Sequence, residues 1–186
     1  MADLVRADPY LPSRVVENLF WFGRYCERCD ASARLLRILL GRYLDGDSPQ
    51  ALEAAVQLAE EVSLLPGEGT LDTRLRTALL DPGWDFSLRA NLQRLQWAAG
   101  QVRGKLSREN WQALSELQRE AQRLDDLSAD FTELLDFLDR LILSMAALSG
   151  FALDDMTRDE GWRFLLTGRR IERLHALSSS LAAFLR

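Results

Sequence analysis

The sequence predicts an all-α protein, a helical bundle of about six or seven helices. Apolar residues recur at three- and four-residue intervals along most of the 186 residues, which is the spacing of amphipathic helices. No stretch alternates between apolar and polar residues as a half-buried strand does. Short clusters of proline, glycine and aspartate separate the periodic stretches, as expected for tight connections in a bundle.

Four helices are expected in the first half of the chain, after an N-terminal arm of residues 1–12. Ser13 follows a proline and is expected to cap the first helix. Clusters of turn-forming residues end the first three helices. The four helices span, in order, about residues 13–44, 50–64, 71–80 and 87–104.

Two or three further helices are expected in the second half. Ser107 is expected to cap the first of them. A weak break is predicted at residues 125–128, and Gly150 is expected to stop the helix that follows it. Residues Thr157 to Glu160 match a capping box, which opens a last helix that runs to the C-terminus. Residues 13–186 are therefore expected to form a single helical domain.

Composition and charge argue against several classes of protein. The net charge is −5, so no basic field draws the chain to nucleic acid or to anionic lipid. The longest apolar stretch, residues 141–153, is interrupted by serine and glycine and is too short to cross a bilayer. The first twelve residues contain no apolar run of the kind found in signal peptides. We therefore expect a cytoplasmic protein with no membrane or nucleic-acid partner.

The only two cysteines, Cys26 and Cys29, form a C-x-x-C pair on the apolar stripe of the first helix. A tetrahedral zinc site would need two more ligands, and His175 is the only histidine. The cysteines are therefore expected to be packing residues. We expect no metal and no cofactor, and the sequence names no catalytic residue.

The pattern G-R-x-x-E-R occurs twice, at residues 23–28 and again 145 residues later at 168–173. Arginine and glutamate are rarely buried unless paired, yet both copies lie in apolar helical stretches. The two helices are expected to pack together, each glutamate facing the other's arginine, as an internal repeat with an approximate twofold. The candidate binding residues are Arg14, Glu17, Arg24, Glu27, Arg28, Arg169, Glu172 and Arg173.

Two roles are open to this charged cluster. A buried arginine–glutamate network can fix the register of two helices without any further function. Alternatively, the arginines can bind a phosphate or carboxylate group through paired hydrogen bonds. Residue types and spacing alone do not separate these roles.

Residues 13–28, which read S-R-V-V-E-N-L-F-W-F-G-R-Y-C-E-R, resemble the opening signature of the alpha-E domain family. Residues 101–111 and 156–173 resemble two later segments of that family, in family order. Val16 and the pair Cys29-Asp30 depart from the usual signature. The family is all-helical and typically longer, so the resemblance implies a shortened member or a fragment.

The resemblance implies a helical accessory or partner-binding domain that acts with an ATP-grasp amide ligase in peptide synthesis or modification. Its implied partners are that ligase and a peptide substrate. One alternative is a stand-alone enzyme that uses the Arg/Glu cluster to bind an anionic substrate, and another is a purely structural scaffold. A shortened second half also predicts an exposed apolar patch, covered by a homodimer or by a partner.

Overall fold

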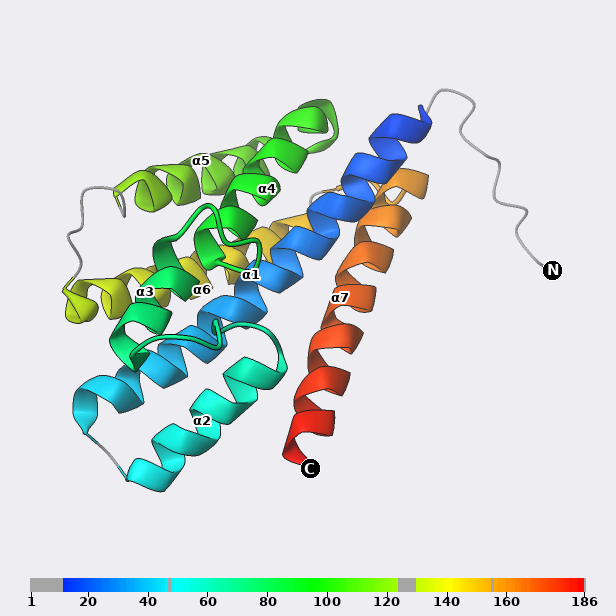
Figure 1. The fold of residues 1–186 in the computed structure, drawn as a ribbon. Coiled ribbons are helices and arrows are strands. Elements are labelled where there is room, and N and C mark those ends of the chain that lie inside the picture. The colour runs from blue at the N-terminus through cyan, green and yellow to red at the C-terminus, as the bar shows by residue number, and fades with distance from the viewer. Residues whose placement is uncertain (1–11, 47, 124–129, 155, 186) are drawn as a thin grey trace.

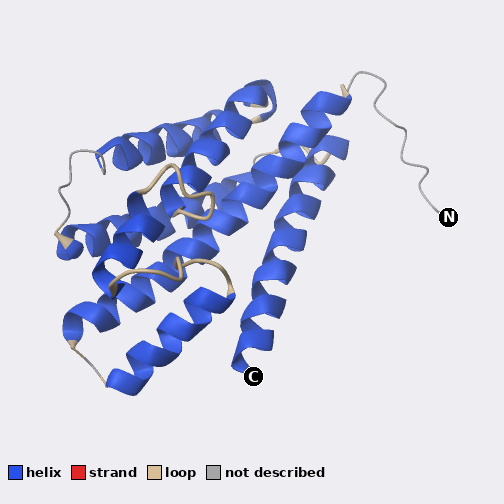
Figure 2. Ribbon diagram, in the orientation of Figure 1, coloured by secondary structure: helices blue, strands red, loops and turns tan. Residues whose placement is uncertain are grey.

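A computed structural model describes residues 12–46, 48–123, 130–154 and 156–185. Throughout these ranges the regular structure is helical, as Figure 2 shows, and the all-α prediction is confirmed. The α-helices are α1 (Ser13–Asp45), α2 (Pro49–Glu61), α3 (Leu71–Leu80), α4 (Leu88–Gln101), α5 (Arg108–Arg123), α6 (Phe131–Asp154) and α7 (Glu160–Phe184), and a short 3-10 helix, η1 (Arg103–Lys105), follows α4.

The first and last helices lie side by side and run in the same direction (Figure 1). Both begin at the same end of the molecule, and they diverge toward their C-terminal ends, where α2 contacts α7. The contact between α1 and α7 is the most extensive between any two of the described helices. The two motif helices therefore pack together, as the sequence predicts.

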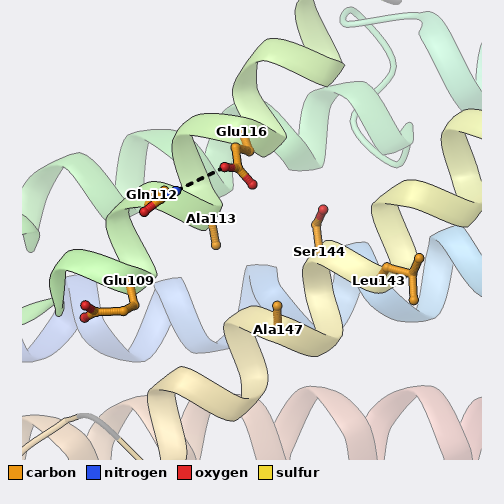
Figure 3. Close-up of a pocket in the computed structure, with 7 residues that line it drawn as sticks. All are labelled: Glu109, Gln112, Ala113, Glu116, Leu143, Ser144 and Ala147. Atoms are coloured by element: carbon orange, nitrogen blue, oxygen red, sulfur yellow. Dashed lines mark hydrogen bonds between the residues drawn. The ribbon is translucent and has the colours of Figure 1, made fainter.

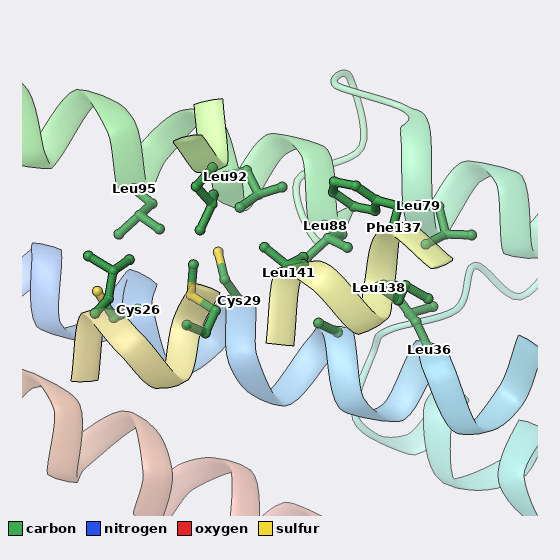
Figure 4. Packing of buried hydrophobic residues seen from close by; sticks show 14 of the residues in the cluster. Cys26, Cys29, Leu36, Leu79, Leu88, Leu92, Leu95, Phe137, Leu138 and Leu141 are labelled. Carbon is green, nitrogen blue, oxygen red and sulfur yellow. The ribbon is translucent and has the colours of Figure 1, made fainter. Parts of the chain in front are cut away.

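The opposite face of α1 is buried in the hydrophobic core. Its apolar residues lie three and four positions apart, from Leu19 through Cys26 and Cys29 to Leu36, and none is more than 8% exposed. Leucines of α4 and apolar side chains of α6 pack over them, including Leu92 (Figure 4). Burial of each such leucine stabilises the fold by about 1.5–3 kcal/mol.

The helix starts are predicted with mixed success. Ser87 and Ser107 each cap a helix, accepting hydrogen bonds from the backbone N–H groups of Ala90 at 3.0 Å and Asn110 at 3.1 Å. The prediction for Ser13 is wrong, because Pro12 occupies the N-cap position and no side chain caps α1.

Two further helix signals are also misread. Asp159, not Thr157, caps α7, and its carboxylate accepts from the N–H of Trp162 at 2.9 Å. Gly150 does not stop α6, which continues to Asp154, since a glycine inside a helix costs only about 1 kcal/mol relative to alanine. The second helix ends at Glu61 and the fourth at Gln101, three residues earlier than expected in each case.

The weak break predicted at 125–128 lies outside the described residues. Among the described helices, none combines the length and the hydropathy needed to cross a membrane.

Candidate functional site

Six side chains of the two repeated motifs meet where α1 packs on α7. Each glutamate accepts hydrogen bonds from two arginines of the opposite helix, so the six residues form two units of three. This is the reciprocal pairing that the sequence predicts. The Glu172 unit consists of Arg24, Arg28 and Glu172, and the Glu27 unit consists of Glu27, Arg169 and Arg173.

In the Glu172 unit, the Nε atoms of Arg24 and Arg28 donate to different carboxylate oxygens of Glu172, both at 2.6 Å. Burial alone would raise the pKa of Glu172, but the hydrogen bonds and charges of Arg28 and Arg24 outweigh it and lower the pKa from its ordinary value of 4.5. A carboxylate held in this way is a weak proton acceptor. Glu172 is therefore poorly suited to act as a general base.

In the Glu27 unit, Arg169 donates from Nε to Oε1 of Glu27 at 2.7 Å. Arg173 donates from Nε to Oε2 at 2.8 Å and from Nη2 to Oε1 at 3.0 Å. The Nη2 of Arg169 also donates to Oγ of Ser149 on α6, at 2.6 Å. This unit is therefore tied to a third helix, and the side chain of Arg169 is only 10% exposed while that of Arg173 is 61% exposed.

The two motif glycines allow α1 and α7 to approach closely. A Cβ atom at Gly23 would overlap the carbonyl oxygen of Leu165, and one at Gly168 would overlap the carbonyl oxygen of Phe20. Both overlaps involve backbone atoms, which cannot rotate out of the way. The glycines therefore set the separation of the two helices, while the arginines and glutamates set their register.

Aromatic rings of α1 cover the Glu172 unit. The rings of Trp21 and Tyr25 stack with their centroids 5.7 Å apart. The guanidinium carbon of Arg24 lies 5.4 Å from the ring centroid of Trp21, and that of Arg28 lies 5.7 Å from the ring centroid of Tyr25. These distances are typical of cation–π contacts, so the arginines are engaged by rings as well as by Glu172.

The Glu27 unit borders a cavity of about 310 Å³ instead. Arg170, which the sequence analysis missed, is exposed and lines this cavity with Arg169 and Arg173. One signal could have identified it: the second motif reads G-R-R where the first reads G-R-Y.

Two of the eight candidate residues lie outside both units. Arg14 and Glu17 are exposed on the first turns of α1. Among the described residues, no hydrogen bond or ion pair joins either side chain to the network. The structure thus brings together six of the eight predicted residues.

The cysteines are buried in the core. Burial raises the pKa of the Cys26 thiol to about 12, although the charge of Arg169 acts in the opposite direction. Burial likewise raises the pKa of Cys29 well above its ordinary value. Both thiols therefore stay protonated at neutral pH, a state that suits neither nucleophilic attack nor metal binding. Across the described residues, no three histidine, cysteine or acidic side chains are grouped so that they could hold a metal ion.

A second cavity, of about 400 Å³, lies between α5 and α6 (Figure 3). Its charged residues are Glu109 and Glu116, and Glu116 accepts a hydrogen bond from Gln112 at 3.4 Å. The hydroxyl of Ser144 donates to the carbonyl of Arg140 at 3.1 Å, so it is not poised for chemistry. The cavity beside the Glu27 unit is the better candidate for a binding site.

Comparison with known proteins identifies relatives but no described activity. The uncharacterized proteins Rv2567 of Mycobacterium tuberculosis and Mb2597 of Mycobacterium bovis are each 31% identical to this chain over 195 residues. The match covers 92% of this chain but only 22% of each relative, so the chain spans about a fifth of their length. No solved structure matches the chain.

A family model named Alpha-E matches residues 11–186. It is described as a predicted alpha-helical domain with a conserved ER motif. The helical content agrees with that description, and Glu27-Arg28 and Glu172-Arg173 are the Glu-Arg dipeptides of the two repeated motifs. Since the match covers nearly the whole sequence, the chain belongs to the Alpha-E family.

Proposed function

We propose that this chain is a helical accessory domain that acts with an ATP-grasp amide ligase in peptide synthesis or modification. The ligase, with its peptide substrate, would bind through α7. The observation that carries the proposal is an apolar stripe along α7 and its C-cap residue that no described residue covers. The stripe consists of Phe164, Ile171, Leu174, Leu177, Leu181, Phe184 and Leu185.

The stripe is too apolar and too exposed for an ordinary helix surface. Its seven side chains are between 43% and 85% exposed. Isolated apolar side chains on a surface are normal, but a contiguous row of this size marks an interaction site. Between residues 161 and 185 the only acidic residue is Glu172, which is buried. A partner surface would therefore be apolar with acidic margins.

The buried face of α1 shows what kind of surface fits the stripe. A shift of 145 residues, the spacing of the two motifs, maps the buried Leu19, Cys26, Cys29 and Leu36 of α1 onto four positions of the stripe: Phe164, Ile171, Leu174 and Leu181. On α1 this face is covered by α4 and α6. The matching face of α7 is therefore suited to pack against a similar layer of helices.

The comparisons support a domain that works beside other domains. The relatives are more than four times as long as the region that matches this chain. The resemblance to alpha-E proteins implies that the companion is an ATP-grasp ligase. A stand-alone enzyme is less well supported, because each motif glutamate is engaged by two arginines and the pKa of Glu172 is lowered.

The proposal is tested by mixing the purified chain with an ATP-grasp amide ligase encoded in the same genome. We expect a stable complex by light scattering, and faster ATP-dependent amide formation than with the ligase alone. Leu174→Asp and Leu181→Asp should abolish both effects, because each places a charge within the apolar interface. Leu143→Asp is the matched control, since Leu143 is an equally exposed leucine on α6.

Either of two outcomes would contradict the proposal. The first is that the ligase does not bind the chain and that the rate of amide formation is the same with and without the chain. The second is that two copies of the chain form a homodimer through the apolar stripe, so that the stripe is not available to the ligase. Leu174→Asp would then break the homodimer.

A further inference from the structure

The two units of the network differ at the positions that flank them. Trp21 and Tyr25 cover the Glu172 unit, and the residues 145 positions later are Leu166 and Arg170. A tryptophan is thus replaced by a smaller side chain and a tyrosine by a cation. On this side the network borders a cavity of about 310 Å³, which lies within the range of small-molecule sites.

The lining of this cavity carries an excess of positive charge. Its charged residues are Arg169, Arg170, Arg173 and Glu27, and its other lining residues are Ser149 and Leu166. Glu27 neutralises one of the three guanidinium groups, which leaves a net charge of two. Arg170 makes no hydrogen bond or ion pair with any residue that the structure describes. Its donors are free for a ligand.

The other two arginines are held in place before any ligand arrives. Arg169 is fixed between Glu27 and Ser149, and the hydroxyl of Ser149 in turn donates to the carbonyl of Met145 at 2.8 Å. Arg173 is anchored by two hydrogen bonds to Glu27 while most of its side chain stays exposed. Cations that are oriented in advance lose little conformational entropy when an anion binds.

We propose that this cavity binds the phosphoryl group of a small phosphorylated molecule. Arg170 and Arg173 contact the phosphoryl oxygens directly, and Arg169 contributes charge from behind them. A phosphoryl dianion balances the net charge of the lining, and its oxygens suit the paired donors of arginine. A carboxylate would leave one positive charge unbalanced. This inference adds a ligand to the proposed function. It rests on that function only for the source of the phosphoryl group, which would be the reaction of the ligase.

The test is titration calorimetry of the purified chain with inorganic phosphate at constant ionic strength, with acetate as the comparison anion. We expect one phosphate site and weaker binding of acetate. Arg170→Ala should weaken phosphate binding by about tenfold or more, the loss expected for a charged hydrogen bond. Arg163→Ala is the matched control, because Arg163 is an exposed arginine of α7 outside the cavity. It should leave the affinity within about twofold.

Equal loss of affinity in the two variants would show that phosphate responds only to net charge, and would overturn the proposal. So would acetate binding as tightly as phosphate, or no phosphate binding at all. Both variants change exposed side chains, so both should fold, and circular dichroism checks this. Failure of phosphate binding with an intact ligase complex would overturn this inference alone. If the chain binds phosphate but does not bind the ligase, the proposed function alone would be overturned.

Discussion

In the Glu172 unit the arginines lie against Trp21 and Tyr25, whereas in the Glu27 unit the equivalent arginines face a cavity together with Arg170, which pairs with none of the residues that the structure describes. In both units one glutamate accepts hydrogen bonds from two arginines of the opposite helix, although only the Glu27 unit is also bonded to a third helix, through Ser149. A similar pairing therefore occurs in two different environments. The surrounding side chains, more than the ion pairs themselves, decide whether a unit lies against aromatic rings or borders a cavity.

The largest expected difference between the units is in stability. Glu27→Gln leaves the buried Arg169 without its main partner, and should lower the free energy of unfolding by about 3–5 kcal/mol. Glu172→Gln should lower the free energy of unfolding by less, about 1–3 kcal/mol, because Arg24 and Arg28 are more exposed than Arg169 and keep their aromatic contacts. Urea unfolding of both variants measures this. Equal losses would mean that the aromatic contacts do not matter.

The close approach of the helices should be equally necessary to both units. Gly23→Ala and Gly168→Ala each place a Cβ against a backbone carbonyl, so each should destabilise the fold by about 1–3 kcal/mol. Gly41→Ala, also on α1, is the control, because a Cβ there meets nothing within 4 Å. It should be neutral or stabilising by up to about 1 kcal/mol. Thermal unfolding of the three variants tests this. If Gly41→Ala lowers the melting temperature as much as the other two, close packing of the helices is not the cause.

The Glu172 unit should also confer a pH dependence. The pKa of Glu172 is lowered on folding, so its stabilising contribution is complete above the ordinary value of 4.5 and is lost as the pH falls through the lower, folded-state pKa. The difference in free energy of unfolding between the native chain and Glu172→Gln should therefore be constant at neutral pH and should narrow as the pH falls below 4.5. Glu17→Gln, at an exposed glutamate outside the network, serves as the control. If the difference in free energy of unfolding stays constant with pH, the pKa of Glu172 is not lowered on folding.

The smallest expected effect on stability comes from exchanging the flanking residues. The double variant Trp21→Leu, Tyr25→Arg gives the Glu172 unit the flanking residues of the Glu27 unit, at a cost of about 1–2 kcal/mol from lost ring contacts. Calorimetry should then show two phosphate sites where the native chain has one. The reverse exchange, Leu166→Trp with Arg170→Tyr, should remove the native site. If neither double variant changes the number of phosphate sites, the phosphate binds elsewhere on the chain.

The pairing of the network could be predicted from sequence because it depends on residue type and helical spacing. Arginine and glutamate that recur in apolar helices have few stable arrangements other than mutual pairing. The limits of the site could not be predicted in the same way. Arg14 and Glu17 share a face with Arg24, but they are exposed and lie outside both units, and residue type and helical spacing do not show this.

The errors at helix ends have local causes. Gly150 is a helix-stopping signal in isolation, but a glycine inside a helix costs only about 1 kcal/mol relative to alanine, and α6 continues through it. Thr157 and Asp159 are both good capping residues, and the backbone uses the later one. The sequence distinguishes Arg170 only as the second arginine of G-R-R, and its place beside the cavity is a tertiary property that becomes visible once the surroundings of the second motif are known.

The hydrogen bonds between α1 and α7 join residues 142 to 148 positions apart in the chain. Contacts at such separation form slowly, because a long loop must close before they do. During synthesis, α1 is made first and its core face can be covered by α4 and α6 while Glu27 still lacks both arginines. The network is therefore completed only after α7 has left the ribosome. Neutralisation of Glu27 therefore requires that synthesis has passed α7, and a chain interrupted before α7 keeps an unpaired carboxylate beside its core.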